Sequence, residues 1–145
     1  MIVEWIILAD RAEVINNKLY LMGGGWDSLT VNSGFPAIHP CALAVSFRVP
    51  WNETNQRHNI EVEILDEDGQ SSLAKVAGQI EVGRPAGIRP GQAQRLQMGI
   101  NLSLEVAKPG LYEVVARIEG QKLGDTAFTV IPGPNLAELD TIGLQ

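Results

Sequence analysis

Residues 110–120 read Gly-Leu-Tyr-Glu-Val-Val-Ala-Arg-Ile-Glu-Gly, and this stretch, with the return of the chain over residues 123–131, decides the fold class. The side chains expected to face the core are Tyr112, Val114, Ala116 and Ile118. Between residues 113 and 119, Val115 is the only apolar residue on the opposite face. Alternation with a period of two is typical of a half-buried strand. We therefore predict a β-hairpin that turns at Gly120 and returns through Phe128 and Val130.

The same alternation recurs along the chain. It is clearest over residues 96–106, where apolar residues alternate with polar residues or glycine, and Leu102 is expected to be buried there. Residues 42–49 and 60–64 also alternate, whereas 32–40 and 50–59 are predicted loops. The pattern predicts roughly eight to nine strands in an all-β fold. We expect a two-sheet antiparallel sandwich with Greek-key or immunoglobulin-like connections.

Residues 2–9 are predicted to form a strand that is apolar on both faces. One face is expected to hold Val3, Trp5 and Ile7, and the other Ile6 and Leu8. Such a strand lies either between two layers or against another protein chain. A bulge is expected at residues 10–11. The three glycines at 23–25 predict a bulge, a sheet crossing or a close backbone approach.

Length and charge limit the function classes. A chain of 145 residues favours one domain, predicted over residues 1–132, with a C-terminal tail over 133–145 that packs on the domain or on a neighbouring subunit. The net charge of −6 argues against nucleic acid as a partner, because an acidic surface repels phosphates. The apolar run at residues 5–9 is too short to cross a bilayer and lacks the features of a signal peptide. We therefore expect a cytoplasmic protein without a membrane partner.

Two N-terminal segments resemble a known family. They are Asp10-Arg11-Ala12-Glu13 and the segment Lys18-Leu19-Tyr20-Leu21-Met22-Gly23-Gly24-Gly25-Trp26-Asp27. This arrangement is similar to the opening of a family of uncharacterised bacterial proteins, a domain of unknown function, in which an Asp-x-Ala segment precedes a Lys-Leu strand ending in glycine. The Gly110-x-Tyr112 strand is similar to the C-terminal half of that family. The resemblance implies a β-sandwich and supplies neither an activity nor a catalytic residue.

No group of residues in the sequence points to a known catalytic site. His39 and Cys41 are two apart and would share a strand face, but a lone cysteine in a strand is usually a buried apolar residue. Glu61 and Glu63 have the spacing of any exposed strand with alternating glutamates. We predict a protein that is not an enzyme and has no cofactor.

Metal binding is a minor hypothesis. Asp66 and Asp68 lie in an Asp-Glu-Asp-Gly segment, and loops at one end of a β-sandwich can bind Ca²⁺ through carboxylates. The same composition is typical of a solvated hairpin turn, which is the preferred interpretation.

The remaining candidates are residues for interaction with a partner. Trp5 and Trp51 are aromatic candidates, and Arg84, Arg89 and Arg95 surround a proline- and glycine-rich loop. The tail adds an apolar set, Leu136, Leu139 and Ile142, and residues 136–139 are predicted to form one helical turn. We predict a non-catalytic binding or assembly module that forms a homo-oligomer. The alternatives are a Ca²⁺- or carbohydrate-binding module and, third, an enzyme of unrecognised type.

Overall fold

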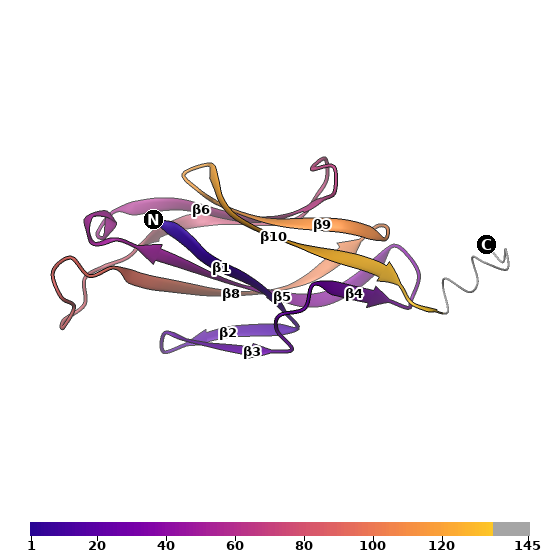
Figure 1. Ribbon diagram of the computed structural model, residues 1–145, viewed down its shortest axis with the longest axis horizontal. Helices are drawn as coiled ribbons and strands as arrows, with labels where there is room; N and C mark the ends of the chain where they lie inside the picture. The colour runs from indigo at the N-terminus through magenta and orange to yellow at the C-terminus, as the bar shows by residue number, and fades with distance from the viewer. Residues whose placement is uncertain (135–145) are drawn as a thin grey trace.

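The computed structural model describes residues 1–134, which form ten strands and one short 3₁₀ turn (Figure 1). The strands are β1 (Ile2–Ala9), β2 (Arg11–Ile15), β3 (Lys18–Met22), β4 (Ser28–Val31), β5 (Ala37–Val49), β6 (Arg57–Asp66), β7 (Ser72–Glu81), β8 (Gln94–Val106), β9 (Gly110–Ile118) and β10 (Gln121–Pro132). The 3₁₀ turn η1 (Trp51–Glu53) connects β5 to β6. The all-β prediction is confirmed. The predicted helical turn and tail residues after 134 lie outside the described residues.

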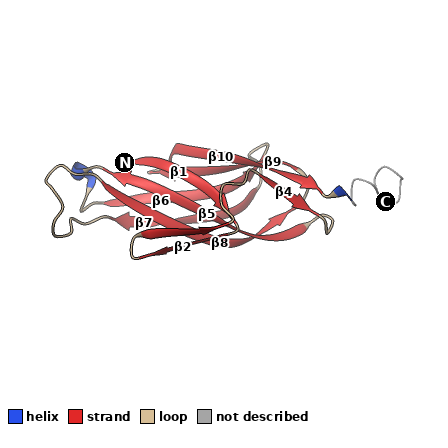
Figure 2. Cartoon of the chain, turned by 60° about the horizontal axis from the view of Figure 1, so that its bottom comes forward, coloured by secondary structure: helices blue, strands red, loops and turns tan. Residues whose placement is uncertain are grey.

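The strands form three sheets, not the two that the sequence predicted. A three-stranded sheet has the order β1-β5-β8, a five-stranded sheet has the order β4-β10-β9-β6-β7, and β2 and β3 form a separate ribbon. The assembly curls like half of a barrel (Figure 2). One pair also differs from the antiparallel expectation, because β4 runs parallel to β10. The hairpin predicted from residues 110–131 is present as β9 and β10.

The main core lies between the two larger sheets. Its buried side chains come from the three-stranded sheet, as with Phe47 and Leu104, and from the five-stranded sheet, as with Val114 and Phe128. Phe128 stacks on Tyr112 with ring centroids 5.5 Å apart. The alternation in β8 correctly predicted which residues face this core. Leu102 is only half-buried, however, which corrects the expected full burial.

A second, smaller core lies on the other side of β5. It consists of Ala9, Ala12, Ala42 and Ala44, with Trp5, Ile7, Leu19 and Leu21 packed around them. The ribbon β2–β3 therefore covers the outer face of the three-stranded sheet. This arrangement answers the question posed by the apolar strand at residues 2–9, because β1 lies between two layers of its own chain.

The faces of β1 differ from the prediction at one residue. The pairing of β1 with β5 shifts register between Val3 and Trp5, so a bulge lies at Glu4. The extra residue turns Val3 toward the main core, where it packs with Ile6 and Leu8, and leaves Trp5 in the second core. At residues 10–11, where a bulge was expected, the chain instead leaves one sheet and enters the ribbon.

Two of the predicted loops are shorter in the structure. Strand β5 begins at Ala37 and includes Pro40, so the loop predicted over residues 32–40 ends early. Strand β6 begins at Arg57 instead of residue 60. The glycine run is a sheet crossing, one of the predicted alternatives, and a Cβ at Gly23 would overlap the carboxylate of Asp10.

Side-chain amides of β8 fix the ribbon on the sheet. The Asn101 side chain accepts a hydrogen bond from the Ala12 N–H (3.1 Å) and donates one to the Ala12 carbonyl (2.7 Å). Gln97 donates to the carbonyl of Asn17 in the ribbon turn (3.0 Å). Gly99 lies between them, and a Cβ there would be 3.0 Å from the Ala12 carbonyl oxygen. The ribbon is therefore held by two side-chain amides, and the lack of a side chain at Gly99 between them lets the ribbon backbone approach β8 closely.

We predict that truncating two residues of β8 will have unequal effects. Leu104 is fully buried, so Leu104→Ala should lower the free energy of unfolding by about 2–5 kcal/mol through lost contacts and a cavity. Leu102→Ala should cost less, because Leu102 is already half-exposed. Urea denaturation of both variants measures the difference, and equal losses would contradict the placement of this strand.

Asn101→Ala should also destabilise the protein. It leaves the part-buried N–H and carbonyl of Ala12 without their partners, which costs about 1–3 kcal/mol for each group left unpaired. The matched control is Asn52→Ala, at an exposed asparagine in η1. If urea denaturation gives both variants the same stability, the amide of Asn101 does not hold the ribbon.

Candidate functional site

The aromatic candidate Trp51 is already covered by an arginine of the same chain. The Arg84 guanidinium lies 3.7 Å from the centre of the Trp51 ring. Arg84 also donates to the Trp51 carbonyl (2.8 Å) and to Oγ1 of the buried Thr54 (2.6 Å). The two residues form one stacked unit that closes the 3₁₀ turn against the loop after β7. Neither side chain is presented as a free platform for a sugar or an anion.

The arginines around the loop do not converge on one site. Arg95 donates to both carboxylate oxygens of Glu4, at 2.7 and 3.1 Å. Ser46, which is fully buried, donates to the same carboxylate at 2.8 Å. The Arg95 bonds, followed by the Ser46 bond, lower the pKa of Glu4 from its usual 4.5 to about 2. Arg89 is exposed in the loop between β7 and β8.

The acidic turn uses Asp66 for its own structure. The Asp66 carboxylate accepts hydrogen bonds from the N–H groups of Gln70 (2.9 Å) and Ser71 (3.1 Å). The bond from Ser71 is the main reason why the pKa of Asp66 is lowered. Asp68 is exposed. Within residues 1–134, no three side chains of His, Cys, Asp or Glu are grouped as a metal site requires.

Cys41 lies in the main core, two residues after His39 in the same strand, β5. Only 2% of its surface is exposed, and burial raises the pKa of its thiol to about 11. A thiol with such a pKa is protonated at neutral pH and is a poor nucleophile.

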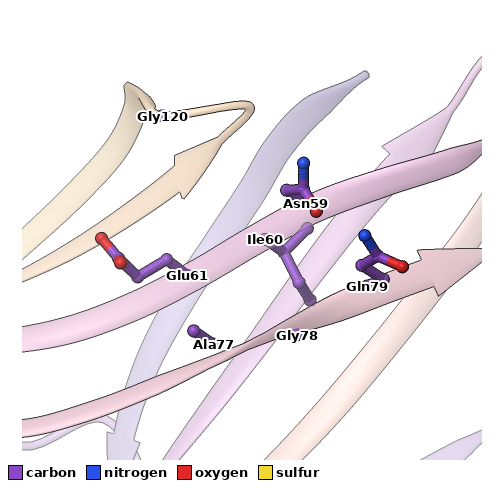
Figure 3. A pocket seen from close by; sticks show the side chains of 7 residues that line it. All are labelled: Asn59, Ile60, Glu61, Ala77, Gly78, Gln79 and Gly120. Carbon is purple, nitrogen blue, oxygen red and sulfur yellow. The ribbon is translucent and has the colours of Figure 1, made fainter.

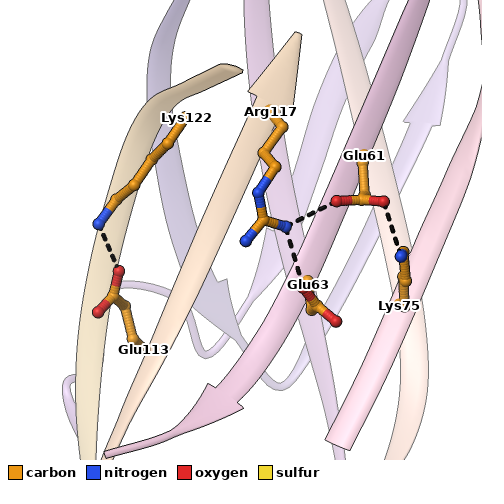
Figure 4. Close-up of polar contacts among 6 residues, drawn as sticks. All are labelled: Glu61, Glu63, Lys75, Glu113, Arg117 and Lys122. Carbon is orange, nitrogen blue, oxygen red and sulfur yellow. Dashed lines mark hydrogen bonds and ion pairs between the residues drawn. The ribbon is translucent and has the colours of Figure 1, made fainter. Parts of the chain in front are cut away.

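The outer face of the five-stranded sheet carries a network of charges (Figure 4). Arg117 of β9 donates to Glu61 (2.6 Å) and to Glu63 (2.9 Å) of β6, and Lys75 of β7 pairs with Glu61 (2.9 Å). Bonds from Lys75 and Arg117 lower the pKa of Glu61. Glu61 and Glu63, which the sequence placed on one exposed strand face, therefore both bind Arg117.

Beside this network is a shallow depression of about 340 Å³ (Figure 3). Its lining includes three small residues, Ala77, Gly78 and Gly120. Two of the polar groups that line it already have partners, since the Asn59 amide donates to Glu119 (3.1 Å) and Glu61 holds Arg117 and Lys75, whereas the third, Gln79, is exposed. The depression is therefore a hollow with few free hydrogen-bonding groups that could orient a small molecule.

The two larger sheets are closed along one side only. On the closed side β1 approaches β10, where Val3 lies so near Gly124 that a Cβ there would be 2.7 Å from its Cγ1. On the other side β7 and β8 are each the last strand of their sheet, and neither pairs with the other or with a further strand in residues 1–134 (Figure 2). We call this second side, with the two strand edges that border it, the open side.

The open side exposes apolar side chains that point inward. Val76 of β7 pairs directly with the core residue Val62 and so faces the core, yet it is 40% exposed. From β8 the open side includes four half-buried residues, Leu96, Met98, Ile100 and Leu102. Sequence alternation placed these residues on an inward face but gave no sign that the facing sheet leaves them uncovered.

A pocket of about 380 Å³ lies at one end of the open side. It is lined by Leu73 at the start of β7, by Ala107 just after β8, and by Tyr112, whose hydroxyl donates to the Lys108 carbonyl (2.6 Å). Three charged residues also line it: Asp66, Glu105 and Lys108.

The other interaction candidates lie elsewhere. Trp5 is half-buried in the second core, where its ring supports the ribbon. Trp26 packs edge-to-face on Phe128, with ring centroids 5.9 Å apart. Leu136, Leu139 and Ile142 lie outside the described residues. No helix in residues 1–134 is long and apolar enough to cross a membrane.

The chain belongs to a family of unknown function (DUF6941), whose model matches residues 4–131. The match runs from the bulge in β1 to the end of β10 and so includes all ten strands wholly or in part. The resemblance to a family of unknown function is thereby confirmed. The bacterial origin and the N-terminal Asp-x-Ala pattern stay predictions. No curated protein matches the chain.

The Glu4 cluster predicts how stability depends on pH. Because the folded state lowers the pKa of Glu4 to about 2, its stabilising effect is complete above about pH 4.5 and is lost as the pH falls toward 2. We expect the difference in unfolding free energy between the wild type and Glu4→Gln to be larger at pH 6 than at pH 3. Urea denaturation at both pH values measures it.

The control for this experiment is Glu67→Gln, which removes the same charge from the exposed turn and reports the effect of net charge alone. A Glu4→Gln difference that is the same at pH 6 and pH 3 would show that the bonds from Arg95 and Ser46 do not favour the ionised carboxylate.

Proposed function

We propose that this protein is a non-catalytic assembly module, built on a scaffold of the β-sandwich type, that binds a polypeptide strand along its open side. The partner is a second copy of the chain, so the functional form is a homo-oligomer. The cytoplasmic and bacterial setting expected from the sequence belongs to the same proposal.

One observation carries this proposal: in residues 1–134, two strand edges without a pairing partner border a strip of half-exposed apolar side chains. Strand β7 has ten residues, and the backbone N–H and C=O groups of alternate residues, those that do not bond to β6, face an edge that no other strand of residues 1–134 covers. Main-chain groups at such an edge give affinity to an added strand, and alternate side chains give specificity. Val76 and the four inward residues of β8 would lose their remaining contact with water when a strand is added.

The other edges are less suited to this role. Strand β4, at the opposite edge of the five-stranded sheet, has only four residues. Strand β1 carries a bulge at Glu4 and lies against β10. Short edge strands and bulges are the usual means by which proteins block strand addition. Strand β7 is ten residues long, and its one register shift, which leaves Leu73 without a partner on β6, lies near the start of the strand, so residues 74–81 pair regularly with β6.

The absence of catalysis is part of the proposal. It is supported by what the candidate catalytic groups do: the Cys41 thiol is buried, and Glu61 and Glu63 both bind Arg117. A thiol without solvent access and carboxylates fixed by an arginine are better explained as structural groups than as reacting ones.

Val76→Lys should abolish self-association. The wild type is expected to have a mass in light scattering that is a multiple of 15.7 kDa at micromolar concentration. A lysine on the inner face of the edge strand would place a charge in the apolar strip, and this should return the mass to that of one chain. Circular dichroism confirms that the variant is folded.

The matched control is Leu111→Lys. Leu111 is 43% exposed on the outer face of the same sheet, in the internal strand β9, so its substitution should leave the mass of the assembly unchanged. A wild-type mass of 15.7 kDa at these concentrations overturns the proposal, as does an assembly that Leu111→Lys disrupts and Val76→Lys does not.

A further inference from the structure

We infer that β7 of one copy pairs with β7 of a second copy as its antiparallel neighbour, with Gly78 of both strands at the two-fold axis. This inference rests on the proposed function and names the segment of the partner that binds. The five-stranded sheets of the two copies then join into one continuous sheet across the axis.

The faces of β7 limit how two copies of it can pair. Val76 pairs with the core residue Val62 of β6, so in residues 74–81 the even-numbered side chains face the core and the odd-numbered ones face outward. A two-fold axis perpendicular to the sheet keeps the inner faces of both copies on the same side. Residues opposite each other in an antiparallel pair share a face. An even-numbered residue is therefore opposite an even-numbered residue of the partner, and the axis passes beside a single residue of each strand.

The two charged residues of β7 select one of these registers. They are Lys75 and Glu81, which have opposite signs and are both exposed on the outer face. With the axis at Gly78, Lys75 is opposite the partner's Glu81, and the same contact forms again across the axis. Lys75 already pairs with Glu61 (2.9 Å), but its ammonium has three N–H groups and the side chain is half-exposed, so it can bind a second carboxylate. Moving the axis by one residue in either direction places neither charge opposite the other.

The same register suits the inner face of the strand. Val76, which is 40% exposed, is opposite the partner's Ile80, so apolar side chains meet across the axis. Apart from its chain neighbours, no atom of residues 1–134 lies within 4 Å of the position that a Cβ would take at Gly78. Packing within these residues therefore does not require a glycine here, whereas glycine in a strand often marks the close approach of another backbone.

Charges beyond the ends of β7 favour the antiparallel direction. Residues 66–68, in the turn before β7, read Asp-Glu-Asp, whereas residues 82–93, after β7, include Arg84 and Arg89 and no acidic residue. An antiparallel pair places the acidic turn of each copy level with the basic segment of the other. A parallel pair would place segments of like charge at the same level, where they repel.

Cysteine substitution tests which residue lies at the axis. Gly78→Cys brings two cysteines opposite each other, with Cα atoms about 4.5–5.5 Å apart, which is within the range of a disulfide. Val76→Cys and Ile80→Cys are the matched controls, because each cysteine is displaced from its own copy by four residues, about 13 Å along the strand. After oxidation with copper phenanthroline, a non-reducing denaturing gel should show a product of twice the chain mass for Gly78→Cys only. The wild type controls for the native Cys41, which is 2% exposed.

Charge reversal gives an independent test in solution. Lys75→Glu places two glutamates opposite each other, and Glu81→Lys places two lysines opposite each other, so each variant should raise the dissociation constant of the assembly about tenfold. An equimolar mixture of the two variants restores both attractive pairs and should assemble as tightly as the wild type. Since the mixture contains the same two chains, their individual stabilities do not explain such a recovery. Analytical ultracentrifugation measures the dissociation constants.

The possible outcomes separate the inference from the proposed function. The pairing through Gly78 is overturned if Gly78→Cys gives no linked product, if the controls link as readily, or if the mixture assembles no better than its components. When any of these results accompanies a wild-type assembly that Val76→Lys still disrupts, the proposed function stands and only the inferred pairing fails. A wild type of single-chain mass overturns both.

Discussion

The rest of the structure depends on the burial of β5 on both faces. Every residue from Cys41 to Phe47 is buried, although β5 belongs to a sheet of only three strands. A strand buried on both faces needs a layer of structure on each side. The five-stranded sheet supplies one layer over Leu43 and Phe47. The ribbon supplies the other, and it approaches closely because Ala42 and Ala44 have small side chains.

Separate local features explain why the two larger sheets meet on one side and not on the other. The bulge at Glu4 turns Val3 inward, and the absence of a side chain at Gly124 lets β1 and β10 meet. On the opposite side, the segment of residues 82–93 between β7 and β8 is held at one end of the molecule. Arg84 is stacked on Trp51, and the Gln94 side chain bonds to the Gly83 carbonyl. The two strands are thereby kept as edges of different sheets instead of forming a hairpin.

The sequence predicted where the strands lie along the chain far better than it predicted which strands pair with one another. Period-two patterns depend on neighbours along the chain, so β6, β8 and β9 could be recognised, and so could the inward face of β8. Leu102 and Leu104 have the same pattern but different burial, because burial depends on how far the facing sheet extends. The two-sheet expectation was wrong because a ribbon of two five-residue strands, such as β2–β3, has no sequence signal that assigns it to a separate layer.

The candidate sites were the least predictable part for a related reason. Trp51 and Arg84 are 33 residues apart in the sequence, and Glu4 and Arg95 are 91 apart, so nothing local indicates that each pair is already engaged. The one available hint was Glu4 itself, a charge within an apolar strand, which marks the bulge that carries it toward Arg95. The open side had no hint at all, since exposure of an inward face is a property of the assembled sheets.

An exposed edge strand such as β7 can pair with a further chain, so some feature must limit the number of copies in the assembly. Its inner face carries no charge from Ala74 to Ile80, so the strand lacks the inward lysine that commonly prevents uncontrolled pairing. If edges paired head to tail, each copy would keep one free edge and the assembly would extend into filaments. A two-fold arrangement in which the open sides of two copies face each other closes after two copies, because each copy covers the free edge of the other. A net charge of −6 adds repulsion between such closed pairs. A closed two-fold arrangement therefore reconciles a long unprotected edge with an assembly of finite size.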